Sequence, residues 1–332
     1  DISDLVQKVK EAGCEAEPIV QAAKLLETGM ADKAFSVLDQ YILQNHQTCI
    51  EEAYFLRAYA YYKSVKTEDY AQLLNAERMF QDALIIYPKS AYLPYGYTGI
   101  GLIHKRLNNV SAAEGYFNIV KQGYLDYPGL AEIMFHLAQV YEVKGFEDKS
   151  LTYYQQVFED SEENAYIADA GIGYGKALFN KRRYLDALSV LNYVVESAPK
   201  KMYESSDLLL YIGNANYEVG LAVQARERLT RAMNLFSQIP EPDVILSRIG
   251  DTYGMENNVG KAVKVYELVR EKYPDTEGYI ASSIGIARYL EKDDDKMEIY
   301  RMVKTKFPEN KFARIAMMRL AEIYQKNGEY NK

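Results

Sequence analysis

The sequence predicts an all-α protein, an α-solenoid of about eight and a half helix–turn–helix repeats, and two phased series of small residues predict it. The first series falls on the first helix of each predicted repeat, at gaps of 37, 37, 38, 37 and 35 residues: Gly101, Ala138, Gly175, Gly213, Gly250 and Gly285. The second falls on the second helix, at gaps of 37, 37, 37, 38 and 37: Ala76, Ala113, Ser150, Ala187, Ala225 and Ala262. A fixed period of roughly 20 to 50 residues is typical of a repeat array, in which each unit packs on its neighbours.

One period, residues 168–199, shows the two predicted helices. Apolar residues recur at helical spacing in two blocks, and the polar turn 180–183 (Asn-Lys-Arg-Arg) separates them. Pro199 follows the second block, where a proline commonly stands just beyond a helix. The sequence shows no sustained alternation of apolar and polar residues, so no strand is expected. Each period is therefore expected to form two antiparallel helices of about a dozen residues or more.

The small residues have a physical reason. Two helices of one unit approach closely only where their side chains are short. Glycine inside a helix costs about 1 kcal/mol relative to alanine, so its return at one phase indicates a packing contact that outweighs this cost. Replacing Gly175 or Gly213 by leucine is expected to push the two helices apart.

Composition and charge narrow the function classes. Hydrophobic residues make up 48% of the 332 residues, which suffices for a folded chain, and the formal net charge is −8. An acidic chain lacks the basic face that nucleic acids select through counterion release, so no nucleic-acid partner is expected. The longest apolar runs are far shorter than the roughly 20 residues that a bilayer-spanning helix needs, so no transmembrane segment is expected.

The unit around Gly250 carries the clearest motif, which runs Leu246, Ile249-Gly250, Tyr253, then Ala262, Tyr266, Val269 and Pro274. It resembles the tetratricopeptide repeat, whose pattern is W-x2-L-G-x2-Y, then A-x3-F, then A and P. The resemblance implies a right-handed solenoid over residues 15–332, preceded by an N-terminal helical lead-in over residues 1–14. The last repeat is only half written, and the natural protein is expected to continue beyond residue 332.

The chain departs from the family pattern in two ways. The usual period is about 34 residues, whereas most periods here have 37. The unit from Ala58 to Ala76 also holds about six extra residues around Thr67–Leu74. These could lengthen the helices, lengthen the loop or form a local binding feature, and lengthened helices are favoured.

Several links between units read Tyr-Pro or Phe-Pro followed by polar residues, at 87–90, 273–276 and 307–310. In this style the repeats resemble those of bacterial envelope proteins, which implies a periplasmic or outer-membrane-associated protein, with a cytoplasmic one as the alternative. Cys14 and Cys49 bear on the same question. They are either two separate buried thiols or a disulfide that ties the first repeat to its leading segment and indicates an oxidising compartment.

No residue pattern predicts catalysis, a metal site or a cofactor. The three histidines have no partner at metal-ligand spacing, and the two cysteines form no C-x2-C pair. No P-loop, dinucleotide-binding or nucleophile-elbow motif occurs. We therefore expect a protein that is not an enzyme and needs no cofactor.

The resemblance places a partner in the concave groove that the first helices line. Carried onto this sequence, the lining is aromatic in its N-terminal half and includes basic and polar residues: Phe55, Tyr59, Tyr62, Lys63, Tyr95, Lys105, Arg106, Phe135, Gln139, Lys176, Phe179, Asn180, Asn214, Tyr217 and Asp251. Such a strip suits an extended or helical peptide with acidic residues, since Lys and Arg hold carboxylates while rings cover apolar side chains. The family's carboxylate clamp is only loosely matched, by Lys105, Arg106, Lys176, Asn180 and Asn214.

The resulting hypothesis is a non-enzymatic scaffold that binds a protein or peptide through its concave groove. The links between repeats favour a bacterial cell-envelope assembly for secretion, motility or outer-membrane biogenesis. Two alternatives stay open: a glycan-binding module of a polysaccharide or peptidoglycan machine, and a regulatory arm of a larger protein that continues beyond residue 332. The apolar ends of a repeat array also allow self-association.

Overall fold

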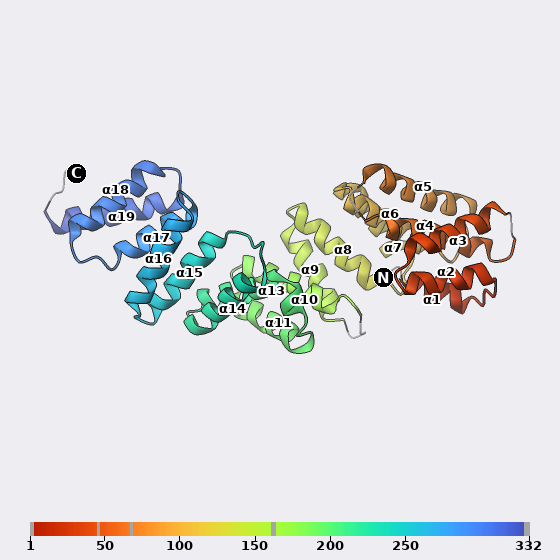
Figure 1. The fold of residues 1–332 in the computed structure, drawn as a ribbon, viewed down its shortest axis with the longest axis horizontal. Helices are drawn as coiled ribbons and strands as arrows, with labels where there is room; N and C mark the ends of the chain where they lie inside the picture. The colour runs from red at the N-terminus through yellow and green to blue at the C-terminus, as the bar shows by residue number, and fades with distance from the viewer. Residues whose placement is uncertain (1–2, 45–46, 67–68, 161–163, 329–332) are drawn as a thin grey trace. The chain divides into compact units, whose positions relative to one another are not determined.

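A computed structural model of the chain describes residues 3–44, 47–66, 69–160 and 164–328, which hold nineteen helices and no strand (Figure 1). Eight consecutive pairs make up most of the fold: α2 (Glu17–Glu27) with α3 (Ala31–Leu43), α4 (Ile50–Ser64) with α5 (Tyr70–Ile86), α6 (Leu93–Arg106) with α7 (Val110–Gly123), α8 (Leu130–Val143) with α9 (Glu147–Phe158), α10 (Ile167–Asn180) with α11 (Tyr184–Ser197), α13 (Ser206–Glu218) with α14 (Ala222–Leu235), α15 (Pro242–Met255) with α16 (Val259–Lys272), and α17 (Glu277–Ala287) with α18 (Asp293–Lys306).

Three helices stand outside the pairs. They are α1 (Ser3–Glu11) before the first pair, the single turn α12 (Lys201–Glu204) before α13, and α19 (Lys311–Lys326) after the last pair. The all-α solenoid predicted from the repeat period is confirmed. Eight pairs and one further helix are consistent with the expected count of about eight and a half repeats.

Six of the eight pairs are joined by a three-residue turn whose middle residue has a left-handed backbone. These middle residues are Gly29, Asn108, Gly145, Arg182, Gly220 and Asn257. A left-handed residue directly after a helix ends it and reverses the chain, so that the second helix can run back along the first. Glycine adopts this conformation without steric cost, whereas a residue with a Cβ atom adopts it only at an energetic cost.

Most glycines of the first-helix series face their own second helix, whereas Gly285 meets Tyr266 on α16 of the preceding pair. A Cβ atom added at Gly175 would lie 2.4 Å from Cγ of Leu191, and one added at Gly213 would lie 2.6 Å from Cδ2 of Leu229. In both cases the partner lies sixteen residues further on, in the second helix of the same pair. The contact predicted from the glycine series is therefore confirmed.

The second pair takes up the extra residues seen in the sequence. α4 has 15 residues and α5 has 17, whereas α6 and α7 each have 14. α4 ends at Ser64 and α5 begins at Tyr70, and residues 67 and 68 between them lie outside the described part of the chain. The favoured expectation of longer helices is confirmed for this pair.

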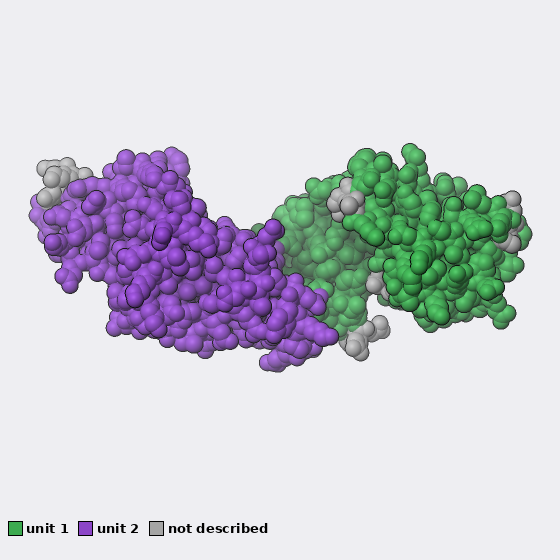
Figure 2. All heavy atoms as spheres, in the orientation of Figure 1, with its two compact units in different colours: residues 1–174 green, residues 175–332 purple. Residues whose placement is uncertain are grey.

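The chain divides into two compact units, residues 1–174 and residues 175–332, here called unit 1 and unit 2 (Figure 2). In unit 1 one large cluster of buried apolar residues extends along the chain from Leu5 to Tyr141. In unit 2 one cluster gathers around Leu209, Leu229 and Ile249, and another joins α17, α18 and α19. Each unit therefore has its own buried core.

Candidate functional site

In unit 1 four aromatic residues predicted to line the groove lie in the core. Phe55 and Tyr59 on α4, Tyr95 on α6 and Phe135 on α8 are at most 8% exposed. The ring of Tyr95, for example, packs edge-on against the ring of Tyr127, with centroids 5.0 Å apart. In this structure these four side chains are buried and not accessible to a partner, contrary to the exposed groove lining that the prediction describes.

The helix α1 takes part in this burial. It contacts α2 and α4, and its side chains Leu5, Val6 and Val9 are at most 4% exposed. These three belong to the same buried cluster as Tyr59 and Tyr95. Positions i, i+1 and i+4 lie on one side of a helix, so α1 lays a single apolar side against the first helices of unit 1.

A cleft of about 460 Å³ lies beside α1. Its walls are the polar side of α1, the start of α6 and the link before α8, with Asp4, Gln7, Lys8, Glu11, Ala91, Pro94, Tyr95 and residues 123–128. Burial raises the pKa of Tyr95 to about 12, and the carboxylates of Asp4 and Glu11 add to the rise. The acidic residues Asp4 and Glu11 of α1 thus lie near the phenol of Tyr95. The cleft shows that α1 does not fill the space beside α6.

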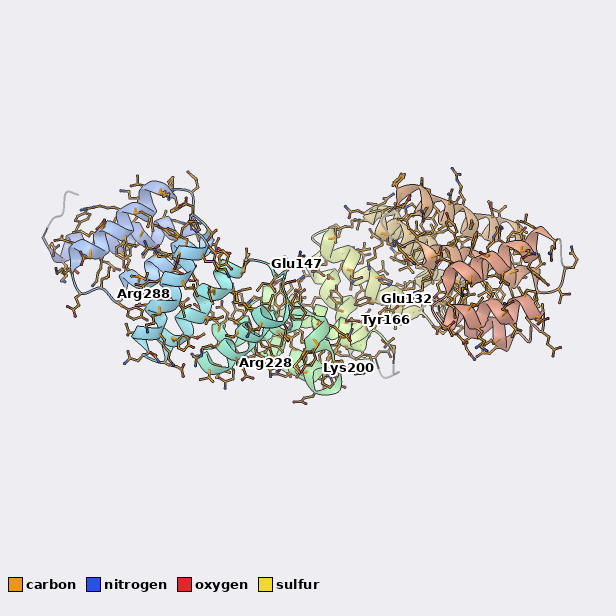
Figure 3. The ribbon with its side chains drawn as sticks, in the orientation of Figure 1. Glu132, Glu147, Tyr166, Lys200, Arg228 and Arg288 are labelled. Carbon is orange, nitrogen blue, oxygen red and sulfur yellow. A yellow bond between two sulfur atoms is a disulfide. The ribbon has the colours of Figure 1, made fainter. Side chains whose placement is uncertain are left out.

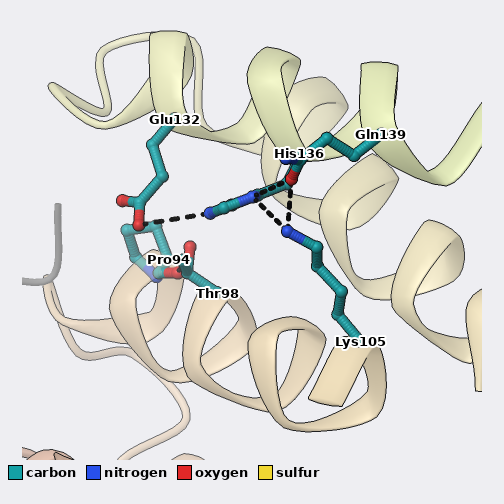
Figure 4. Close-up of polar contacts among 6 residues, drawn as sticks. All are labelled: Pro94, Thr98, Lys105, Glu132, His136 and Gln139. Atoms are coloured by element: carbon teal, nitrogen blue, oxygen red, sulfur yellow. Dashed lines mark hydrogen bonds and ion pairs between the residues drawn. The ribbon is translucent and has the colours of Figure 1, made fainter. Parts of the chain in front are cut away.

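Further along unit 1, α6 and α8 are joined by a buried polar cluster (Figure 4). Nζ of Lys105 lies 3.1 Å from Nδ1 of His136 and contacts Oε1 of Gln139. Nε2 of His136 lies 3.7 Å from Oε1 of Glu132. Burial lowers the pKa of Lys105 to about 8. Lys105 and Gln139 were predicted as lining residues, whereas Glu132 and His136 were not.

The charges of this cluster influence each other. Burial alone would raise the pKa of Glu132, but the hydrogen bond with His136 and nearby positive charge outweigh it and lower this pKa to about 2. Burial lowers the pKa of His136, and the positive charge of Lys105 acts in the same direction. The cluster therefore favours the charged carboxylate of Glu132 and disfavours the charged amine of Lys105.

The other predicted residues of unit 1 lie beside aromatic rings. The guanidinium of Arg106 lies 5.4 Å from the ring centroid of Tyr62, and its Nη2 donates to the carbonyl oxygen of Val65 at 3.1 Å. Nζ of the exposed Lys63 lies 5.8 Å from the ring centroid of Tyr59. Rings of α4 thus position basic side chains from α4 and α6.

In unit 2 the predicted residues form a polar row with one residue that the sequence prediction missed. Nη1 of Arg248 donates to Oδ1 of Asn214 at 2.6 Å, and its guanidinium lies 5.5 Å from the ring centroid of Tyr217. The hydroxyl of Tyr217 donates to Oδ2 of Asp251 at 2.9 Å. The row therefore connects the first helices α13 and α15 through side chains alone.

Asp251 continues the row towards α17. Its Oδ1 accepts a hydrogen bond from the hydroxyl of Tyr266 at 2.6 Å and lies 3.6 Å from Nη1 of Arg288. Arg288 follows the last residue of α17, and its side chain is 59% exposed (Figure 3). Burial, together with the Asp251 carboxylate, raises the pKa of Tyr217 and Tyr266 above the usual range. Both phenols therefore stay protonated donors to the carboxylate.

The predicted residues on α10 make more modest contacts. Nζ of Lys176 lies 3.8 Å from Oδ2 of Asp207 and 5.8 Å from the ring centroid of Tyr211. The rings of Phe179 and Tyr211 meet edge-on at 5.3 Å. Asn180 is the last residue of α10 and is exposed. The lysine and the phenylalanine join α10 to α13 through Asp207 and Tyr211.

A spacing of 34 residues recurs among the contacts between neighbouring first helices. It is found in Lys105–Gln139, Asn214–Arg248 and Tyr217–Asp251. Because the period is 37, each side chain meets the next first helix about one helical turn earlier than its own position. This spacing could have identified Arg248 from the sequence, whereas no comparable signal marks His136 or Arg288.

A disulfide joins Cys14 to Cys49, whose Cα atoms are 6.0 Å apart. Cys14 lies shortly after α1, and Cys49 directly precedes α4. Of the two alternatives that the sequence left open, the structure contains the disulfide. It ties the lead-in segment to the helix whose face α1 contacts.

The described residues contain no group of three or more His, Cys, Asp or Glu residues placed to hold a metal ion. None of the helices described combines the length and the apolar character that crossing a bilayer requires.

The fold is that of a helical-repeat protein, in which side chains of neighbouring first helices contact one another. Residues 246–276 match the family model of the tetratricopeptide repeat. The chain therefore contains a tetratricopeptide repeat over these residues. No curated protein matches the sequence.

Solved structures with this fold cover most of the chain. The apo form of RapI is 14% identical with a TM-score of 0.63, over 95% of this chain and 93% of that one. The apo form of the quorum sensor NprR from B. thuringiensis is 14% identical with a TM-score of 0.56, over 100% and 96%. The C-terminal part of a TPR repeat-containing protein from Cytophaga hutchinsonii is 14% identical with a TM-score of 0.55, over 79% and 98%. At these identities the likeness is one of fold.

Proposed function

We propose that this protein is a non-enzymatic scaffold that binds a protein or peptide through the faces formed by its first helices. The polar row of unit 2 carries this proposal. Arg248, Asp251 and Arg288 present donors and an acceptor on two consecutive first helices, and Arg288 is largely exposed. Charged groups of this kind bind the carboxylates and main-chain amides of a peptide segment.

The charge of the row favours a partner with acidic residues. The carboxylate of Asp251 already contacts two phenols and Arg288. Because the row holds two arginines and one carboxylate, its net charge towards a ligand is positive. A bidentate guanidinium–carboxylate pair is stronger than an ordinary hydrogen bond. An acidic peptide segment therefore fits unit 2 better than a basic one.

We further propose that the protein works in a bacterial cell-envelope assembly, in the periplasm or at the outer membrane. The Cys14–Cys49 disulfide supports an oxidising compartment, where structural disulfides persist. The Tyr-Pro and Phe-Pro links, which resemble those of envelope repeat proteins, point the same way. Thiol labelling of the protein in intact cells tests this: labelling of Cys14 and Cys49 without a reductant would contradict it.

Affinity capture from an envelope extract tests the scaffold proposal. The full chain is compared with an Arg248→Gln/Arg288→Gln variant and with a Lys264→Gln/Lys272→Gln control. The control loses the same charge from exposed positions of the second helix α16. We expect one protein to be captured by wild type and control, and at least about tenfold less by the variant, which corresponds to about 1.4 kcal/mol.

Circular dichroism establishes that all three chains are folded. Equal capture by all three would contradict the assignment of this face. Binding to a glycan array without any captured protein would favour the glycan-binding alternative.

A further inference from the structure

We propose that the face on which α1 lies, formed by α2 and α4 and bordered by α6 across the cleft, is a helix-binding surface, that α1 occupies it in this structure, and that an amphipathic helix of a partner protein displaces α1 to bind there. The proposal rests on the scaffold function and names the partner and its regulation for unit 1. The partner is a protein helix because the chain already places one on this face.

The helix α1 has the character of a bound ligand. It belongs to none of the eight helix pairs. Leu5, Val6 and Val9 are buried in the cluster that contains Tyr59 and Tyr95, whereas Gln7 and Lys8 are exposed. An amphipathic helix laid with its apolar side on a surface is a recurring mode of peptide recognition.

Several features limit how firmly α1 is held. It has nine residues, and helices shorter than about 12–15 residues are marginal on their own. The ion pair that joins its Lys10 to Glu27 of α2 is about half exposed, and pairs of this kind contribute little. The cleft of about 460 Å³ along its polar side shows that α1 does not fill the available space.

The segment after α1 keeps it near this face. Cys14 is bonded to Cys49 beside α4, so a displaced α1 stays tethered close to its docking site. A tethered ligand competes at a high effective concentration. The apparent affinity of a competing ligand is then its intrinsic affinity multiplied by the fraction of molecules in which the face is open.

The contacts of α1 define the partner helix. It carries aliphatic residues at positions i, i+1 and i+4 on one side, as Leu5, Val6 and Val9 do. Acidic residues beside this side fit the surroundings of Tyr95, which lies near Asp4 and Glu11. A helix longer than nine residues buries more apolar surface than α1 does, and so displaces it.

A binding experiment on the full chain tests the proposal. The probe is a fluorescein-labelled peptide with the sequence of residues 3–11, stapled between the positions of Gln7 and Glu11 to hold the helix. The released variant is Leu5→Asp/Val9→Asp, and the matched control is Gln7→Asp/Lys8→Asp on the exposed side of the same helix. We expect the released variant to bind the probe at least about tenfold more tightly than wild type or control.

A probe with aspartates at the positions of Leu5 and Val9 serves as the negative control. Tight binding of this control probe, or unchanged affinity in a folded released variant, would overturn the proposal. A dimer of the released variant by size-exclusion chromatography, formed by exchange of α1, would also overturn it in favour of a second copy of the chain.

Hydrogen exchange of the wild-type chain keeps the proposal testable if the released variant does not fold. We expect amides of α1 to exchange at least about a hundredfold faster than those of α4 and α6, because α1 opens without unfolding the repeats. Equal protection of all three helices would overturn it. These results are independent of the capture experiment, which depends on Arg248 and Arg288 of unit 2.

Discussion

Units 1 and 2 are built from the same helix pair but use the faces of their first helices differently. In unit 1, Tyr59 and Tyr95 are 4% and 2% exposed beneath a helix from outside the repeats. In unit 2, the side chains of Asp251 and Arg288 are 19% and 59% exposed. The position of a residue within the repeat determines the side it faces, whereas segments outside the repeat determine whether a partner can reach it.

The two units also differ in how they are held together. Only unit 1 contains a disulfide, Cys14–Cys49, whereas close helix contacts occur in both units, at Gly101 in unit 1 and at Gly213 in unit 2. A disulfide acts mainly by restricting the unfolded chain, and a close contact acts by packing in the folded one. The two units should therefore respond to different perturbations.

Removing the disulfide is expected to have the largest effect and to affect unit 1. The bond joins residues 35 apart, and the chain-entropy relation gives about 3–4 kcal/mol for such a loop. The Cys14→Ser/Cys49→Ser variant should lose this from the free energy of unfolding of unit 1. Hydrogen exchange in denaturant measures each unit separately. A dithiol should destabilise wild type in the same way and leave the variant unchanged, and an equal loss in unit 2 would contradict the comparison.

The Gly213→Ala substitution should instead weaken unit 2. The new Cβ atom would lie 2.6 Å from Cδ2 of Leu229 and 3.2 Å from its backbone nitrogen. Overpacking of this kind costs about 1–3 kcal/mol, and we expect about 2. Gly260→Ala is the control, because Gly260 is exposed on α16 and a Cβ atom there meets nothing within 4 Å. Equal stability of the two variants in chemical denaturation would contradict the close contact.

The buried Lys105 predicts a pH dependence that belongs to unit 1. The unfolded lysine keeps its proton up to a pKa of 10.5, whereas folded Lys105 loses it at about 8. Between these values the unfolded state binds more protons, so the free energy of unfolding rises with pH. We expect a rise of about 1–2 kcal/mol from pH 8 to 10. Above about pH 10 the raised pKa values of buried tyrosines such as Tyr59 reverse the trend, because the folded state then binds more protons.

Two variants test the origin of this slope. Lys105→Met should abolish the rise, since no amine then titrates in the cluster. Lys264→Met removes an exposed lysine of α16 and should keep the rise. A flat profile in wild type, or a rise that persists in Lys105→Met, would show that the amine is not desolvated.

Much of the fold follows from the sequence because the repeat makes one contact many times. Gly175 and Gly213 appear at one phase because each must pass close to a second helix, and the structure places Leu191 and Leu229 there. A single-sequence pattern detects a requirement that recurs in this way. The helix pairs, their turns and the longer second pair could all be predicted on this basis.

The candidate site could be predicted less well, because accessibility depends on contacts outside the repeat. Tyr59 and Tyr95 occupy positions that line a groove in the family, but α1 and the neighbouring rings bury them. The sequence of α1 is outside the repeat series, so the repeat pattern does not predict which helices it contacts. Arg248 was missed because its contact with Asn214 crosses between repeats one turn out of phase, which a search at the repeat period does not find.

The smallest expected effect compares equivalent turns in the two units. Gly145 in unit 1 and Arg182 in unit 2 are the middle residues of three-residue turns, with φ of 75° and 59°. The left-handed backbone costs a residue with a Cβ atom roughly 1–2 kcal/mol. Glycine avoids this cost, but its greater freedom in the unfolded chain offsets part of the gain. Arg182→Gly should therefore stabilise unit 2 by about 0.5 kcal/mol, and Gly145→Ala should destabilise unit 1 by about 1 kcal/mol. Thermal unfolding with hydrogen exchange for each unit measures both. Shifts of the same sign in the two variants would mean that the turns do not share one conformation.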